Sequence, residues 1–209
     1  KINALEKKVE KEINFEKEKK VIEEIKKLKR TYGETSEVFK IAEEAKQKWP
    51  SLIIEELSIP ADFRLLVGWT GDSASTSAAI KQMNEFKAAN SGEYHRLYNK
   101  IASIANRAIE NFRTGRNEEF LECLRENEKA LSELGSASGV NIETPELKKL
   151  SDIAADYGAG GKLSGAGGGD CGIAVCFDDI TANNIIAAWQ DEGLVPLDVT
   201  IDRDGVRKD

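Results

Sequence analysis

The sequence has 209 residues, of which 40% are hydrophobic and 32% charged, and its formal net charge is -7. This length suffices for one large domain or two small ones with a hydrophobic core. The acidic balance argues against nucleic acid as the main partner, because phosphate backbones are bound through accumulated Lys and Arg. No apolar run is long enough to span a membrane. Three cysteines without zinc-ligand spacing predict reduced thiols in a cytoplasmic protein.

Residues 1–30 are rich in Lys and Glu, and their apolar residues recur at a spacing of three to four, which is typical of an amphipathic helix. The apolar stripe is interrupted between Ile13 and Val21. A solvated helix that packs one face on its own domain or on a neighbour, and a coiled coil, therefore both remain open. A second helix is expected from Ser36 to Lys48. The predicted domains are a charged helical segment over residues 1–46 and a main domain over residues 47–209.

Beyond residue 50, strand-like apolar runs alternate with helical patterns. The expected strands are 53–57, 63–69, 173–177 and 195–201, and the expected helices are 75–87, 93–114, 117–134, 145–157 and 181–192. The last of these elements follow the order helix, glycine loop, strand, helix, strand. This order favours an α+β fold with a split βαβ, ferredoxin-like sheet that carries helices on one face.

The glycine loop lies within the string KLSGAGGGDCGIAVCFD, residues 162–178, next to an apolar run. Clustered glycines usually mean that something approaches the main chain closely, and their N–H groups can bind an anion. The string lacks the Lys-Ser/Thr ending of a Walker A motif, and it does not open a helix after a strand as a dinucleotide fingerprint does. A phosphate-binding loop and a structural turn remain the two interpretations. Ser164 would add a hydroxyl donor, Lys162 a charge and Asp170 a capping group.

The string from Lys162 to Ile173 resembles the third conserved motif of the GHMP small-molecule kinases, and among these the bacterial phosphomevalonate kinases. Other stretches are similar to the same family in the same order. They are WPSL at 49–52, LVGWTG at 66–71 with ASTS at 74–77, IETPEL at 142–147 and DIA at 152–154. The resemblance covers residues 47–201.

The resemblance implies a kinase that transfers the γ-phosphoryl group of ATP to mevalonate 5-phosphate, in isoprenoid precursor synthesis, with ATP and Mg²⁺ as cofactors. It also implies that this part of the chain is the ferredoxin-like C-terminal domain of such a kinase. Leu163 stands where the family often has a second small hydroxyl residue. By position, the residues that would contact phosphate or substrate are Ser164, Gly165, Ala166, Gly167, Gly168, Gly169, Asp170, Ser75, Thr76 and Ser77.

The family's N-terminal nucleotide loop, P-x-x-x-G-L-G-S-S-A, is not found in this sequence, and its substrate lysine and orienting carboxylate are not identified either. Phosphoryl transfer depends on positioning and charge neutralisation, so we expect little turnover from this chain alone and assign no catalytic residue or metal ligand. The expectation is a fragment or an engineered chain, which would self-associate or bind a complementary N-terminal half. The alternative is a non-catalytic binding or scaffold protein that assembles through residues 1–30.

Overall fold

The computed structural model describes residue 23, residues 57–73 and residues 75–202. The chain divides into two units, Lys1–Glu56 and Leu57–Asp209, and the fold described below is that of the second unit. Apart from Glu23 and Leu57, the helices and the strand expected before residue 58 lie outside the described residues.

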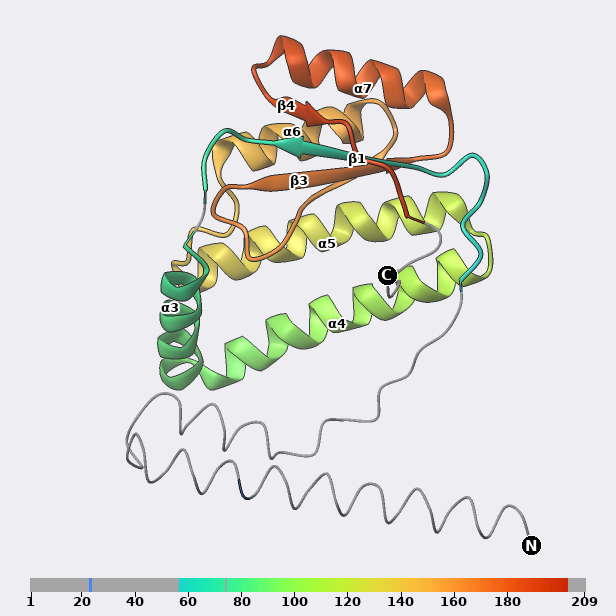
Figure 1. Ribbon diagram of the computed structural model, residues 1–209. Coiled ribbons are helices and arrows are strands. Elements are labelled where there is room, and N and C mark those ends of the chain that lie inside the picture. The colour runs from blue at the N-terminus through green and yellow to red at the C-terminus, as the bar shows by residue number, and fades with distance from the viewer. Residues whose placement is uncertain (1–22, 24–56, 74, 203–209) are drawn as a thin grey trace, which may run out of the picture. The chain divides into compact units, whose positions relative to one another are not determined.

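A four-stranded antiparallel sheet forms the centre of the fold (Figure 1), with the strand order β2-β3-β1-β4. Its strands are β1 (Arg64–Trp69), β2 (Gly160–Leu163), β3 (Cys171–Cys176) and β4 (Val195–Leu197). With the two helices α6 (Pro145–Asp156) and α7 (Asp179–Asp191), they make a β-α-β-β-α-β unit, which is the ferredoxin-like arrangement. The predicted fold class is confirmed.

Helices α6 and α7 cover one face of the sheet because two strand glycines let them approach closely. A Cβ atom at Gly68 would lie 2.7 Å from Cδ1 of Leu150, and one at Gly172 would lie 2.6 Å from Cδ2 of the same side chain. Trp189 of α7 is fully buried beside them, and its indole N–H donates to the Leu150 carbonyl at 3.1 Å. The main core therefore lies between this face and the two helices.

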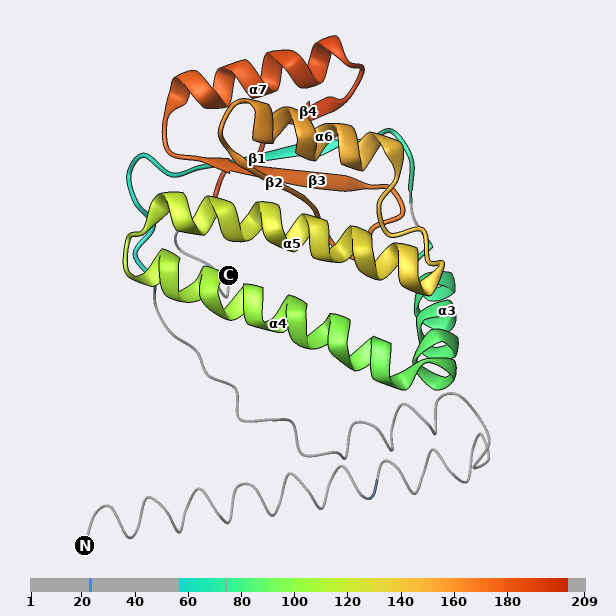
Figure 2. The ribbon, with the colours of Figure 1, turned by 180° about the vertical axis from the view of Figure 1, so that it is seen from behind.

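Three further helices precede α6 in the chain: α3 (Thr76–Ala89), α4 (Ser91–Arg113) and α5 (Asn117–Ser138). Helix α5 lies against the other face of the sheet, with α4 packed on its outer side (Figure 2). A Cβ atom at Gly160 would lie 2.9 Å from Cβ of Leu124 on α5, so β2 also depends on glycine for this contact. The helical pair adds a second covered face to the expected sheet.

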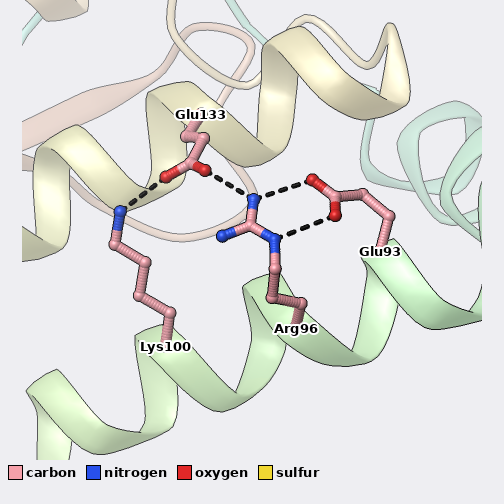
Figure 3. A network of polar contacts seen from close by, with 4 residues as sticks. All are labelled: Glu93, Arg96, Lys100 and Glu133. Carbon is pink, nitrogen blue, oxygen red and sulfur yellow. Dashed lines mark hydrogen bonds and ion pairs between the residues drawn. The ribbon is translucent and has the colours of Figure 1, made fainter.

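Exposed ion pairs join α4 to α5 (Figure 3). Arg96 pairs with Glu93 at 2.7 Å and with Glu133 at 2.6 Å, and Lys100 pairs with Glu133 at 2.5 Å. Exposed pairs of this kind contribute little to stability. The larger contribution comes from a second buried cluster, in which α3, α4 and α5 pack on Ile142, Leu147 and Leu163. This cluster adjoins the glycine loop, because Leu163 directly precedes the loop and the Ile142 carbonyl accepts the Gly168 N–H.

Most predicted elements within the described residues lie within two residues of their expected ends. Strand β4 is shorter than expected, since it ends at Leu197 and not at residue 201. Two further differences matter for the site. Helix α5 continues to Ser138, four residues beyond its expected end at residue 134. Strand β2 was not expected, because Gly160-Gly161-Lys162-Leu163 shows no alternation of apolar and polar residues. Both differences bring ordered structure up to the edge of the glycine loop.

Candidate phosphate-binding site

The glycine loop adopts a run of left-handed backbone conformations. The φ angles are +72° at Gly165, +75° at Gly167, +79° at Gly168 and +140° at Gly169, and Asp170 follows at +56°. Residues with a Cβ atom rarely adopt this region, so the glycines are needed for the path of the chain.

Backbone hydrogen bonds hold the loop at several points. The Ser164 N–H donates to the Cys171 carbonyl at 3.0 Å, and the Gly168 N–H donates to the Ile142 carbonyl at 2.8 Å. The Asp170 N–H donates to the Asp72 carbonyl at 2.7 Å. The loop is thus fixed to β3, to the segment before α6 and to the segment after β1.

Four other N–H groups of the loop have no hydrogen-bond partner within the part of the chain that the structure describes. They belong to Gly165, Ala166, Gly167 and Gly169. Gly167 and Gly169 are buried, and a buried N–H without a partner is costly. A loop with several unclaimed N–H groups is suited to bind an anion.

A cleft of about 180 Å³ opens beside the loop. It is lined by Gly167 and Gly168 of the loop, by Ser75, Ala78, Ala79 and Gln82 at the start of α3, and by Val140 and Asn141. The first turn of α3 contains no acidic residue, and the Ser75 side chain makes no capping hydrogen bond within the described residues. The first N–H groups of a helix lack intrahelical partners and attract negative charge.

The cleft brings together some of the predicted site residues and leaves others at its rim. Gly167, Gly168 and Ser75 line it, whereas Thr76 and Ser77 are exposed on the first turn of α3 without lining it. The other predicted residues, Ser164, Gly165, Ala166, Gly169 and Asp170, belong to the loop but not to the lining. Their contact with phosphate or substrate stays a prediction.

Sequence reasoning missed Gln82 and Asn141. Gln82 donates its side-chain N–H to the Gly139 carbonyl at 2.8 Å, which ties α3 to the segment after α5. Nothing in the helical pattern distinguishes Gln82 from other polar residues of α3. Asn141 could have been suspected, because it lies just before the Thr144-Pro145 helix start, where a loop was expected.

A buried carboxyl group lies behind the loop and was also missed. Glu128 of α5 is only 7% exposed, and its Oε2 accepts the Leu163 N–H at 2.7 Å. Burial raises the pKa of Glu128 above its usual range. Burial also lowers the pKa of Lys162, whose Nζ donates to the Leu163 carbonyl at 2.5 Å.

The described residues contain no group of three or more His, Cys, Asp or Glu side chains that could hold a metal ion. No described helix has the length and apolar content that crossing a membrane requires.

Comparison with known proteins places this geometry in a family. Residues 108–194, from α4 to the residue before β4, match the family model described as GHMP kinases C terminal. This chain carries a GHMP kinase C-terminal domain. The fold described above is consistent with this domain family. The resemblance to GHMP kinases is therefore confirmed.

Relatives of this GHMP kinase domain include a phosphomevalonate kinase of Streptomyces sp. (strain CL190), 32% identical over 77% of this chain and 44% of the relative. The Lin0012 protein from Listeria innocua is 36% identical over 82% of this chain and 46% of that protein, with a TM-score of 0.68. Streptococcus pneumoniae phosphomevalonate kinase, solved with phosphomevalonate and AMPPNP, is 30% identical over 65% of this chain and 38% of its own, with a TM-score of 0.57. The chain thus spans less than half the length of these relatives.

Proposed function

We propose that this chain is the phosphate-binding half of a kinase of the phosphomevalonate kinase type. In this proposal the glycine loop binds a phosphate group of mevalonate 5-phosphate or of ATP. The observation that carries it is the set of four loop N–H groups that have no partner among the described residues and lie next to the cleft at the start of α3. The complex of the S. pneumoniae relative with phosphomevalonate and AMPPNP supports this choice of ligands.

The chain's own residues would bind and orient the phosphate in this proposal. The N–H groups of Gly165 to Gly167 and of Gly169 would donate to phosphoryl oxygens, and the N-terminal end of α3 would add a favourable electrostatic field. Ser75 would contribute a hydroxyl donor from the opposite wall of the cleft. Mg²⁺ and ATP remain implied by resemblance, and because the described residues offer no metal-binding cluster, we assign no ligand to Mg²⁺.

Phosphoryl transfer would require a complementary half. The nucleotide loop of the family is not found in the sequence, and the chain spans only 44% of its Streptomyces relative. We therefore propose that these residues supply positioning on one side of a cleft and that the half of the kinase that they do not match, the complementary half, supplies the other side. The scaffold alternative depends on residues 1–30, which lie outside the described residues except for Glu23. This alternative stays a prediction. The domain boundary after residue 46 and the cytoplasmic location also stay predictions.

An exposed apolar surface at β1 and β4, beyond the part of the sheet that α5 covers, indicates where the complementary half would bind. Trp69 pairs with Val195 and Val67 with Leu197, so these side chains share the sheet face opposite to the one that Gly68 turns toward α6 and α7. Five large apolar side chains on β1, on β4 and just after β4 are between 37% and 50% exposed. They are Trp69, Val195, Leu197, Val199 and Ile201. Exposed apolar surface of this kind is typical of protein–protein interfaces. We propose that it seats the half of a GHMP kinase that this chain does not match.

The partner proposal can be tested with the N-terminal half of the Streptomyces relative as the added chain. We expect its addition to protect the amides of residues 195–201 from hydrogen exchange. Leu197→Asp should abolish this protection. The matched control, Ile180→Asp, changes an apolar residue of α7 that is 75% exposed and should have no effect. Unchanged exchange would refute the partner proposal, and protection that depends only on this chain's concentration would assign the face to a second copy.

The phosphate proposal can be tested by titrating the amide signals of the loop with pyrophosphate. We expect the signals of residues 164–169 to shift with a dissociation constant in the millimolar range, about -4 kcal/mol. Gly165→Ala should weaken binding, because a Cβ atom there would occupy the open space beside the loop into which the phosphate is proposed to bind. Gly115→Ala is the control, since Gly115 has a similar φ of +68° and equally open surroundings in the α4–α5 turn. Loop signals that do not move would identify the loop as a structural turn.

A further inference from the structure

Glu128 satisfies a backbone group that the sheet leaves unpaired. Strand β2 is an edge strand, and the Ser164 N–H points toward β3, where it bonds to the Cys171 carbonyl. N–H groups alternate in direction along a strand, so the preceding N–H, at Leu163, points away from the sheet. Leu163 is only 1% exposed, and a buried N–H without a partner is costly. The Glu128 carboxyl group accepts this N–H at 2.7 Å.

We infer that Glu128 is a positioning residue for the glycine loop. Its carboxyl group fixes the backbone of Leu163, the last residue of β2, and thereby sets where the N–H groups of residues 164–169 lie. The inference rests on the proposed function, because it concerns the affinity of that loop for phosphate. The contact spans 35 positions of sequence and joins the loop to a helix that does not touch the proposed ligand.

The Glu128 carboxyl group has a second hydrogen-bond partner, the Ser151 hydroxyl. The Ser151 hydroxyl lies 3.1 Å from Glu128 Oε1 and 3.1 Å from the Leu147 carbonyl, but it has only one proton to donate. If Ser151 donates to Leu147, a protonated Oε1 can donate to Ser151 while Oε2 accepts from Leu163. Burial of Glu128 favours this neutral form. Gln can make the same two contacts, to Leu163 and to Ser151, which gives the test a conservative variant.

Charged groups lie near Glu128 on α5, on α6, in the segment before α6 and on β2. A groove of about 310 Å³ runs between α5 and α6 and reaches Gly161 of β2. Arg125 and Lys129 of α5 line it, as do Lys148 and Asp152 of α6, and Glu143 lies before α6. Glu143 raises the pKa of Glu128, and Lys162 on β2 lowers it. The groove gives Glu128 a route for proton exchange with solvent.

The test uses the full chain and sulfate, an anion whose charge stays constant over the range in which a carboxyl group titrates. We expect Glu128→Ala to weaken sulfate binding at the loop by about tenfold, which corresponds to one buried N–H losing its partner. Glu128→Gln should bind sulfate within about twofold of the original chain, because it keeps the Leu163 contact. Glu133→Gln is the control, since it removes an exposed carboxylate from the same helix (Figure 3).

A second measurement follows the unmodified chain as pH changes. We expect the amide signals of Leu163 and of the loop to titrate together with the Glu128 carboxyl signal, and this titration to be missing in Glu128→Gln. Sulfate affinity that is equal in folded Glu128→Ala and in the original chain would overturn the inference. If Glu128→Ala does not fold, loop signals that ignore the Glu128 titration would overturn it. If the original chain binds no sulfate, the proposed function fails, and the titration still decides whether Glu128 positions the loop.

Discussion

At the scale of single residues, the glycines of the loop are not equivalent. Gly167 combines a φ of +75° with close contact to the segment before α6, where a Cβ atom would lie 2.1 Å from the Ile142 carbonyl oxygen. Gly158 has a similar φ of +82°, but its surroundings are open. The first position therefore carries both a conformational and a steric requirement, and the second carries only the conformational one.

This difference predicts that Gly167→Ala lowers the free energy of unfolding by about 3 kcal/mol or more, through overpacking added to left-handed strain. Gly158→Ala should cost about 1–2 kcal/mol, the strain alone. Urea denaturation of both variants measures the two values. Equal losses would mean that the loop moves away from Ile142 at little cost, contrary to the anchoring described above.

At the scale of elements, α6 and α3 begin differently. The Thr144 side chain accepts the Leu147 N–H at 3.2 Å and precedes Pro145, as expected for a capped helix start. Ser75 makes no such bond at the start of α3. We expect Thr144→Ala to cost about 1 kcal/mol of stability, whereas Ser75→Ala should leave thermal unfolding unchanged and weaken pyrophosphate binding. A stability loss from Ser75→Ala as large as that from Thr144→Ala would contradict a binding role for this serine.

Helix α7 provides a prediction about pH. The Asp178 carboxylate accepts the Thr181 N–H at 2.7 Å, and this backbone hydrogen bond lowers the pKa of Asp178 below its usual range. Because the pKa of Asp178 is depressed in the folded state, the stabilisation is fully present above the pKa of the unfolded state, about 4. It is lost as pH falls through the pKa of the folded state. Carboxyl-carbon titration by NMR should find the depressed pKa. Asp178→Asn, which keeps an acceptor but does not titrate, should remove this part of the acid sensitivity.

At the scale of the whole molecule, binding and catalysis are expected to separate. The glycine loop and α3 lie within this chain, whereas the family's nucleotide loop is not found in its sequence. We expect turnover with ATP, Mg²⁺ and mevalonate 5-phosphate to stay far below about 1 per second, because most transition-state stabilisation would be missing. A coupled assay for ADP measures this rate. Turnover at ordinary enzyme rates would refute the need for a partner.

The sequence by itself determined those parts of the protein whose signals are local. The Thr144-Pro145 helix start, the amphipathic helices and the glycine loop each depend on neighbours within a few positions. The ferredoxin-like order of the last elements was also readable, because short connections leave few arrangements of strands and helices. The family resemblance came from the glycine motif together with several short stretches in the same order, each of which is readable from neighbouring residues.

The tertiary structure alone decided strand β2 and the surroundings of the loop. Gly160-Gly161-Lys162-Leu163 becomes a strand because two glycines let α5 and α6 pack against it, although its own residues have low strand propensity. Glu128, Gln82 and Asn141 come from segments distant in sequence from the loop, and nothing next to Glu128 or Gln82 in the chain marks their role. Contacts between distant segments depend on how helices and sheet pack, and the periodicity of any one segment does not contain that information.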